Sequence, residues 1–296
     1  MARHQFKYRK PQRRRIRPSR VLMSLLFIGI LVYPFFEASL LTVDQRTVEV
    51  PGLASNLRNL KIVFASDIHQ GPFFSQDRVN QLISKINSLS ADIVILGGDY
   101  ACDSAGAIAF FRNAPRIQAR LGVFGVVGNH DRTIPEHNLS LLMAEMTNYG
   151  CTPLVNSVHQ VRVGQAYVYV VGVDDYDNGF PDVKGVAAQV RKDDFVIFAG
   201  HNPNLWAAVN NAKSMDGSPQ WVNLALFGHT HGGQVTVFGM PLLPGYDPQL
   251  VGRRYLSGWR EENRASILVS NGVGTSVLPV RLFASPQIHL ITLKAK

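Results

Sequence analysis

The sequence predicts an α/β fold built from short apolar strands that end in polar loops. Apolar runs of strand length recur from residue 60 onward, and most of them stop close to a histidine, aspartate or asparagine. Amphipathic segments with three-and-four spacing of apolar residues lie between the first of these runs. Open α/β sheets place their sites at the carboxyl ends of their strands, so these polar residues should gather at one edge of a sheet.

Length and charge narrow the class of protein. The chain has 296 residues, of which 46% are hydrophobic and 17% charged, which is enough for a sizeable core and too short to require several domains. Its net charge is +9, but nine of the 30 Lys and Arg residues and none of the 21 acidic residues fall in the first twenty positions. The rest of the chain is formally neutral, so we expect no nucleic-acid-binding face.

The first forty residues predict a basic tail, 1–20, and a transmembrane anchor, 21–41. Residues 21–36 carry no charge. As a helix they would span about 24 Å, and continuing to Leu41 reaches about 31 Å, close to the roughly 30 Å hydrocarbon core of a bilayer. A cleaved signal peptide, including one of the twin-arginine type, is the competing interpretation, but no clear Ala-x-Ala site follows. We therefore favour an uncleaved anchor in contact with membrane lipid.

The distribution of cations predicts the orientation of this anchor. Nine cations precede it, and only Arg46 and Arg58 lie between it and residue 60. Positive residues remain on the cytoplasmic side, so the rest of this single-pass protein is expected outside the cytoplasm. The alternative is a basic segment lying on anionic lipid, which would leave the body at the cytoplasmic face.

Residues 42–59 are predicted as a linker and residues 60–296 as one domain. The first unit of the domain is a strand, 60–65, followed by Asp67 and His69 and by a helix that Ser75 opens. Residues i and i+2 at the end of an extended strand point to the same side, so Asp67 and His69 can reach one cation. The expected buried face of the helix consists of Val79, Leu82, Ile83, Ile86 and Leu89.

Four later strands also run into polar residues: 92–96 before Asp99, 122–127 before Asn129, His130 and Asp131, 195–199 before His201, and 222–227 before His229 and His231. Other expected elements are helices around 109–117 and 139–146, short β segments over 154–173, and strands at 267–274 and 288–293. The strand ends offer oxygen and imidazole ligands without thiolate, which suits Mn, Fe or Zn in a hydrolytic site. Because these ligands are too many for one ion, two metal ions about 3.5 to 4 Å apart are predicted.

Five motifs, present in order, resemble those of the calcineurin-like metallophosphoesterase family. They are Asp67-x-His69, Gly98-Asp99, Gly128-Asn129-His130-Asp131, Gly200-His201 and Gly228-His229-Thr230-His231, and the resemblance covers residues 61–234. The Gly-Gly-Gln after His231, the turn at 273–276 and the anchor are similar to the membrane-attached YaeI and YkuE type of branch. The resemblance implies a β-sheet sandwich flanked by helices and preceded by one transmembrane helix.

The resemblance also implies a role for each motif residue. One metal ion would be bound by Asp67, His69, Asp99 and His231, and the other by Asp99, Asn129, His201 and His229, with Asp99 as the bridge. His130 would protonate the leaving-group oxygen, and Asp131 would hold the His130 ring through its other nitrogen. The two ions would lower the pKa of a shared water and clamp the phosphoryl oxygens, so no nucleophilic side chain is required.

One position departs from the family pattern. The glycine turn near residue 272 often follows an arginine in relatives, whereas Asn271 stands here. A phosphate-contacting cation is then missing. Arg132 could supply that contact, or it could be a solvated residue at the start of a helix.

Several other reactive residues are expected to have structural roles. Cys102 and Cys151 are expected as free thiols, because small buried thiols are common and the spacing of the pair does not show their distance. Asp174, Asp175 and Asp177 could border the substrate cleft, but turn formation is the commoner role of such residues. Structural or surface positions are expected for His4, His137, His159 and His289.

The sequence therefore predicts a hydrolase that cleaves a phosphodiester, phosphomonoester or pyrophosphate bond, with a lipid-linked substrate suggested by the anchor. Its oligomeric state is left open. One alternative is UDP-2,3-diacylglucosamine pyrophosphatase activity, as in some related enzymes, which requires the domain on the cytoplasmic face. An alternative of another class is a membrane-tethered phosphate-binding scaffold without catalysis. The intact ligand set with His130 favours the enzyme.

Overall fold

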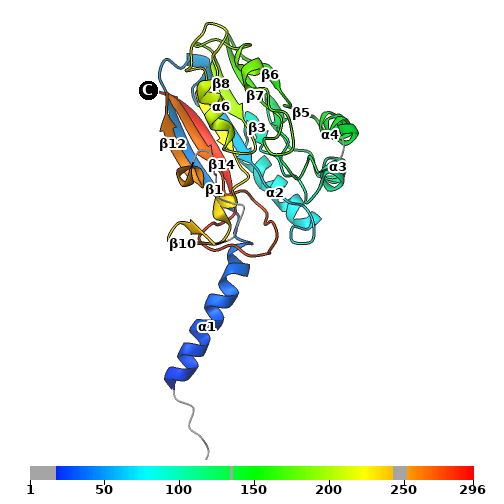
Figure 1. Ribbon diagram of the computed structural model, residues 1–296, viewed down its shortest axis with the longest axis vertical. Helices are drawn as coiled ribbons and strands as arrows, with labels where there is room; N and C mark the ends of the chain where they lie inside the picture. The colour runs from blue at the N-terminus through cyan, green and yellow to red at the C-terminus, as the bar shows by residue number, and fades with distance from the viewer. Residues whose placement is uncertain (1–17, 134–135, 243–251) are drawn as a thin grey trace, which may run out of the picture.

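The computed structural model describes residues 18–133, 136–242 and 252–296. Its body contains two six-stranded sheets, and helix α1 (Pro18–Glu37) projects from one end of the body (Figure 1). The predicted α/β sandwich preceded by one apolar helix is confirmed. In the described part of the chain, α1 is the one helix long and apolar enough to cross a membrane, and a signal sequence would meet the same criteria.

The first sheet has the order β1-β14-β2-β3-β4-β5. Its strands are β1 (Thr42–Val50), β14 (Gln287–Ala295), β2 (Lys61–Ala65), β3 (Ile93–Leu96), β4 (Gly122–Gly125) and β5 (Cys151–Pro153). β2 to β5 are parallel, β14 runs antiparallel to β2, and β1 is parallel to β14. The carboxyl ends of β2, β3 and β4 therefore lie at the end of the sheet where β1 begins.

The second sheet has the order β12-β13-β9-β8-β7-β6. Its strands are β12 (Gly258–Glu262), β13 (Ala265–Val269), β9 (Leu224–Phe227), β8 (Phe195–Ala199), β7 (Ala166–Gly172) and β6 (Ser157–Val163). The four inner strands are parallel, whereas β12 and β6 are antiparallel edge strands. A small hairpin, β10 (Thr236–Val237) and β11 (Met240–Pro241), follows β9.

Helices cover the outer faces of both sheets. They are α2 (Gln76–Ser88), α3 (Ser104–Asn113) and α4 (Glu136–Tyr149) on the first sheet, and α5 (Val183–Ala187) and α6 (Leu205–Asn211) on the second. Short 3-10 turns occur at η1 (Ser55–Leu57), η2 (His231–Gly233) and η3 (Arg253–Tyr255). Ser75 caps α2 as predicted, by accepting the N–H of Arg78. The helix expected to extend to residue 117 ends at Asn113, because Ala114 is extended before Pro115.

The core lies in three layers because the strands are buried on both faces. Ile62 and Phe64 of β2 pack between the two sheets, whereas Val63 and Ala65 pack beneath α2 and α3. Successive side chains of a strand point to opposite faces, so a strand covered on both sides is apolar throughout. Burying each large apolar side chain contributes about 1.5 to 3 kcal/mol.

Residues 42–50, expected as part of a linker, instead form β1. This strand pairs along its whole length with β14, so the domain begins at Thr42. The polar residues Asp44, Gln45 and Arg46 are tolerated because β1 is an edge strand with an exposed side. That polar composition hides the strand from a search for apolar runs.

The end of α1 is bonded to the body. The carboxylate of Glu37 accepts the N–H groups of Phe283 and Ala284, both at 3.1 Å, and the hydroxyl of Ser285 at 2.8 Å. The helix ends here, whereas the sequence predicted an anchor reaching Leu41. Only residues 38–41 separate α1 from β1.

Candidate metal centre

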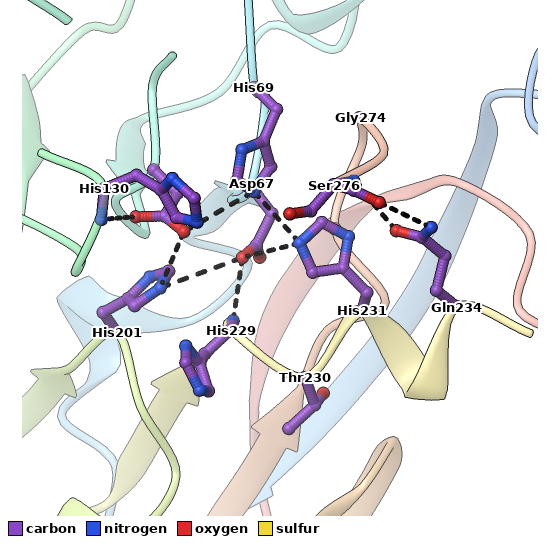
Figure 2. A network of polar contacts seen from close by, with 12 residues as sticks. Asp67, His69, His130, His201, His229, Thr230, His231, Gln234, Gly274 and Ser276 are labelled. Atoms are coloured by element: carbon purple, nitrogen blue, oxygen red, sulfur yellow. Dashed lines mark hydrogen bonds and ion pairs between the residues drawn. The ribbon is translucent and has the colours of Figure 1, made fainter. Parts of the chain in front are cut away.

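The motif residues meet in loops at the carboxyl ends of β2, β3, β4, β8 and β9 (Figure 2). Five of them have backbone in the left-handed region, with φ between 47° and 70°: Asp67, His69, Asp99, His229 and His231. Side-chain-bearing residues held in this region store about 1 to 3 kcal/mol of strain each, and such residues cluster at functional sites. The surrounding sandwich must therefore hold these loops in place.

Two motif glycines are required by close approach. A Cβ at Gly128 would lie 2.2 Å from Oδ1 of Asp99, and one at Gly228 would lie 2.4 Å from Oδ2 of Asp67. Any side chain at either position would displace a carboxylate of the cluster. The glycines thus allow loops from different strands to pack against the two aspartates.

One half of the cluster is enclosed and consists of Asp67, His69 and His231. Nε2 of His69 and Nε2 of His231 lie 3.0 Å apart. Oδ1 of Asp67 lies 3.6 Å from Nε2 of His231. The three side chains are almost completely buried, with side-chain exposures of 0 to 2%. Asp67, His69 and His231 can offer atoms to one metal ion.

The other half opens toward solvent and consists of Asn129, His201 and His229. Oδ1 of Asn129 lies 3.0 Å from Nδ1 of His229, whose side chain is 23% exposed. The buried His201 donates from Nδ1 to the carbonyl of Gly97 at 2.8 Å, since a carbonyl oxygen can only accept. Nε2 of His201 faces Asp99. Burial opposes the charged ring, but the charge of Asp99 prevails and raises the pKa of His201 well above its usual range, so Nε2 would become a ligand once a cation displaces its proton.

Asp99 lies between the two halves. Its Oδ2 is 3.5 Å from Nε2 of His69 and 3.2 Å from Nε2 of His201. Its Oδ1 accepts the backbone N–H of His130 at 3.0 Å. One carboxylate oxygen is thus near imidazoles from both halves, as the predicted bridge requires.

The donor set fits bound cations. Oδ2 of Asp67 and Nε2 of His201 are buried without a hydrogen-bond partner, although buried polar atoms are normally paired. The short distance between Nε2 of His69 and Nε2 of His231 is natural for two nitrogens directed at a common cation. Neutral imidazole and carboxylate oxygen are ligands for zinc, iron and manganese. The identity of the metal is left to experiment.

Burial keeps three of the imidazoles in the ligand form. It lowers the pKa of His69 and of His229 to about 4, and that of His231 well below its usual range. Burial raises the pKa of Asp67 to about 6. For Asp99, burial opposes ionisation, but the neighbouring His201 prevails and the pKa of Asp99 falls well below its usual value.

His130 stands beside the cluster with a defined ring orientation. Its Nδ1 lies 3.0 Å from the carbonyl oxygen of Cys102, so this nitrogen carries the proton of the neutral ring. The His130 ring packs edge-on against that of His69, with centroids 4.9 Å apart. Nε2 is then the nitrogen that can exchange a proton.

Asp131 does not hold the His130 ring, in contrast to the expected arrangement. Its buried carboxylate accepts the backbone N–H groups of Asp99 at 2.7 Å, Gly128 at 2.8 Å and Tyr100 at 3.1 Å. These amides belong to the loops after β3 and β4. Asp131 therefore ties two ligand loops together, and the backbone of Cys102 holds His130.

Arg132 is not a free cation at the site. Its Nη2 donates to Oδ2 of Asp174 at 3.0 Å, and both side chains are almost buried. The interpretation of Arg132 as a solvated residue is therefore wrong, whereas its contact with a phosphate stays a prediction. Asn271 directs its Oδ1 to the hydroxyl of Ser257 at 2.6 Å.

The structure adds one residue that the sequence did not single out, Arg281. Its fully buried guanidinium donates to the carbonyls of Asn271 at 2.7 Å and Ala284 at 2.6 Å, and also reaches those of His231 and Gly274. It lies behind His231 and joins the metal loop to the loop before β14. A single arginine within the apolar stretch 277–283 was the available sequence signal.

The acidic turn after β7 forms its own hydrogen bonds and also lies near the cluster. Asp174 and Asp175 accept backbone N–H groups of the turn itself. Oδ2 of Asp177 lies 3.9 Å from Nε2 of His229 and accepts from Asn202 at 3.0 Å. This carboxylate therefore borders the open half of the cluster.

The residues outside the motifs are structural where the structure describes them. His289 is buried between Asp44 and Ser270, and His159 packs against Phe124. Cys102 and Cys151 are free thiols, as predicted. His4 lies outside the described residues, and so does the side chain of His137.

The fold and this buried cluster of carboxylates and imidazoles define a metal-dependent hydrolase. The family described as calcineurin-like phosphoesterase matches residues 60–233, more than half of the chain, and the protein belongs to that family. It is therefore a dimetal phosphoesterase.

Similar proteins support the assignment, and two of the three named here are covered over most of their length. The uncharacterized metallophosphoesterase YkuE of Bacillus subtilis is 27% identical over 270 residues, which are 88% of each chain. An uncharacterized metallophosphoesterase of Aquifex aeolicus is 27% identical, covering 92% of this chain and 99% of the relative. A Bos taurus protein named transmembrane protein with metallophosphoesterase domain is 26% identical, covering 84% of this chain and 56% of the relative.

Proposed function

We propose that this protein is a membrane-tethered hydrolase that uses two metal ions to cleave a phosphoester bond. The bond is a phosphodiester, a phosphomonoester or a pyrophosphate. One observation carries the proposal: the carboxylate of Asp99 lies between an enclosed group of ligands and an open one, with Oδ2 within 3.5 Å of imidazoles from both. A phosphate-binding scaffold would not need a shared carboxylate at the centre of the site.

Each site residue has a proposed role. The enclosed position is held by Asp67, His69, Asp99 and His231, and the open position by Asp99, Asn129, His201 and His229. When bound, manganese, iron or zinc ions would lower the pKa of a shared water and offset the charge of the phosphoryl group. Because Asn129 and His229 are the more exposed ligands, the open position is the one with room for the phosphoryl group.

His130 acts as the general acid. Its Nδ1–H is held by the carbonyl of Cys102, so Nε2 passes a proton to the leaving-group oxygen. General acids of this kind contribute about 10²- to 10⁴-fold to the rate. Asp131 supports the reaction indirectly, because it fixes the loops that carry Asp99 and Asn129.

The test of the reaction is a metal-dependent assay on the full-length protein in detergent. Hydrolysis of a chromogenic phosphodiester, a phosphomonoester and a pyrophosphate should be measured after addition of manganese, iron or zinc. We expect at least one ester to be cleaved, and chelation should abolish the activity. No turnover with any metal and ester, together with phosphate binding, would favour the scaffold.

Two observations support tethering through α1. Within its stretch Ser19–Glu37, the most apolar 18-residue window has a mean hydropathy of 1.9 and no buried residue. The Bos taurus relative is named a transmembrane protein. The basic tail before α1, which lies outside the described residues, places the catalytic domain outside the cytoplasm by the positive-inside rule.

Sidedness can be tested with a reporter, fused after Lys296, that is active only outside the cytoplasm. The native tail should give an active reporter, and replacing Arg13, Arg14, Arg15 and Arg17 with neutral residues should weaken or scramble the orientation. Activity of the solubilised enzyme should not change, because the metal ligands begin at Asp67. A cytoplasmic carboxyl terminus would reverse the assignment and favour the UDP-2,3-diacylglucosamine substrate.

A further inference from the structure

The metal centre and α1 lie at the same end of the molecule. β1 begins at Thr42, directly after α1, and pairs in parallel with the start of β14. β14 is antiparallel to β2, with His289 opposite Phe64. The carboxyl end of β2, which leads to Asp67 and His69, therefore points toward α1. Figure 1 shows β10 and the loop before β14 at this end of the body.

The loop before β14 is hydrogen-bonded to the last turn of α1. The backbone N–H of Arg281 donates to the carbonyl of Pro34 at 2.9 Å, and Glu37 accepts from the next residues of the loop. The 20 residues of α1 extend about 30 Å as a helix, which matches the hydrocarbon core of a bilayer. A loop bonded to Pro34 therefore lies at the boundary of that core when α1 spans it.

Large apolar side chains are exposed on the two loops at this end. Phe238, at the tip of the β10–β11 hairpin, is 95% exposed, Val277 is 77% exposed and Phe283 is 71% exposed. All three have left-handed backbone, with φ of 51°, 63° and 54°. In water, both the left-handed backbone and the exposed apolar surface of these residues cost free energy. Burial of the side chains in lipid would offset both costs.

The same loops carry the metal centre. The hairpin follows His231 by a few residues, and the backbone N–H of Leu282 donates to the carbonyl of Gln234. The guanidinium of Arg281 joins the loop before β14 to the carbonyl of His231. The apolar tips and the enclosed half of the cluster are thus parts of one bonded unit.

An apolar groove of about 590 Å³ connects these loops with the surface of α1. It is lined by Leu22, Leu26, Gly29 and Tyr33 of the helix and by Leu282 and Phe283 of the loop. The helix residues recur at three-and-four spacing, so the groove runs along one face of α1. From Leu22 to Tyr33 it extends about 16 Å in the direction of the bilayer normal.

We propose that this face, formed by the tips of 236–242 and 277–283, enters the bilayer that α1 spans, and that the metal centre takes its substrate from that bilayer. The substrate is then an amphiphilic phosphoester, with its phosphate at the metal ligands and one acyl chain along the groove. This inference rests on the proposed phosphoesterase function and on α1 as a membrane helix. A protein partner is disfavoured because the groove continues onto the surface of α1 that lipid would cover.

Membrane entry can be tested by fluorescence without any enzyme assay. The full-length variants Phe238→Trp and Tyr167→Trp would be reconstituted into phosphatidylcholine vesicles that contain lipid brominated near the headgroup end of the acyl chain. Tyr167 is exposed at the start of β7, at the far end of the sheet from the metal loops. The signal of native Trp206, Trp221 and Trp259 would be subtracted with the unmodified protein.

We expect the added tryptophan at position 238 to be quenched and the one at position 167 to remain unquenched. Equal and weak quenching at the two positions would overturn the proposed membrane contact, whatever the enzyme does. A protein partner on this face would give that negative result.

The substrate class can be tested with two esters that share one reacting group. Methyl 4-nitrophenyl phosphate is water-soluble, whereas hexadecyl 4-nitrophenyl phosphate partitions into phosphatidylcholine vesicles. We expect kcat/KM to be at least about tenfold higher for the hexadecyl ester with reconstituted enzyme, because its chain brings the phosphate to the membrane face. The double variant Phe238→Asp/Val277→Asp should lose this preference and keep the methyl activity. Met215→Asp, on an exposed side chain at the far end, is the matched control.

The outcomes distinguish a failure of the proposed phosphoesterase function from a failure of the proposed lipid substrate. Hydrolysis of neither ester would overturn an amphiphilic phosphodiester as the substrate; the metal-dependent assay with the phosphomonoester and the pyrophosphate would then decide the proposed function, and the fluorescence result would still decide membrane entry. Equal hydrolysis of both esters would leave the proposed function intact and overturn the lipid substrate. Loss of methyl activity in the double variant would show that the tips act on the site itself, which also contradicts the proposal.

Discussion

The two halves of the metal centre differ in enclosure. Asp67, His69 and His231 have side-chain exposures of 0 to 2%, and the buried Arg281 stands behind them. In the other half, the His229 side chain is 23% exposed, the neighbouring Asp177 side chain 42%, and His130 is half-buried. One half therefore resembles a structural site, and the other a reaction surface.

The difference assigns separate tasks to the two halves. An enclosed ligand set in left-handed loops can hold an ion with little exchange, because water and competing ligands are excluded. An open set beside His130 leaves room for a phosphate and for proton transfer to its leaving group. Asp99 lies between the halves, with Oδ2 within 3.5 Å of imidazoles from both.

The largest expected effect therefore comes from Asp99→Asn. The amide removes the negative charge that holds two cations together, so both halves should lose affinity. We expect hydrolysis to be abolished and metal content, measured by atomic emission, to fall. Asp193→Asn on the surface serves as the control. Full metal occupancy with undiminished turnover would contradict the two-metal assignment.

His130→Ala should affect the open half alone. Because His130 is assigned as an acid and not as a ligand, both metal ions should stay bound while turnover slows by about a hundredfold or more. Esters with nitrophenolate leaving groups should be less affected than alkyl esters, since nitrophenolate needs less protonation. Metal loss, or an equal defect for the two kinds of ester, would show that the assigned role is wrong.

Arg281→Gln should affect the enclosed half. Its fully buried guanidinium donates hydrogen bonds to the carbonyls of Asn271, Gly274 and Ala284. Each buried acceptor left unpaired costs about 1 to 3 kcal/mol. We expect the free energy of unfolding to fall by about 3 kcal/mol or more in urea titrations. Arg120→Gln removes an exposed ion pair with Asp92 and should cost about 0.5 kcal/mol or less. If the free energy of unfolding fell by similar amounts in the two variants, Arg281 would not have the proposed structural role.

Asp177→Asn should give the smallest effect. The carboxylate is partly exposed and lies 3.9 Å from Nε2 of His229, so it influences the open half without belonging to it. We expect kcat to change by less than about tenfold, with metal content unchanged, because screened interactions of this kind are worth about 1 kcal/mol or less. A loss as large as that of Asp99→Asn would make Asp177 a ligand.

The ligand loops could be predicted because each follows an apolar strand directly. Three successive strands are parallel neighbours in the order of the sequence, so residues after them had to meet at one edge. The contacts of Asp131 and Arg132 could not be predicted in the same way. Their partners depend on how the loop after β4 lies against the loops after β3 and β7, and no local pattern encodes that packing.

The edge strand β1 and the attachment of α1 to the body could not be predicted from the sequence, for the same reason. A charged nine-residue segment looks like a linker until β14, more than 240 residues later, provides its partner. Glu37 looked like a charge at a membrane interface, and only the fold supplied the amides of Phe283 and Ala284 that bind it.

The sequence by itself determined the apolar strands that lead to the motifs, the Ser75 cap of α2, the apolar N-terminal helix and the residues proposed as metal ligands. These depend on periodicity, on turn residues and on the chemistry of neighbouring side chains. Only the tertiary structure decided which half of the centre is enclosed, what holds His130 and Arg281, and that the centre lies at the end of the body next to α1. These features depend on contacts between residues far apart in the chain, whose partners are set by the register of β14 between β1 and β2.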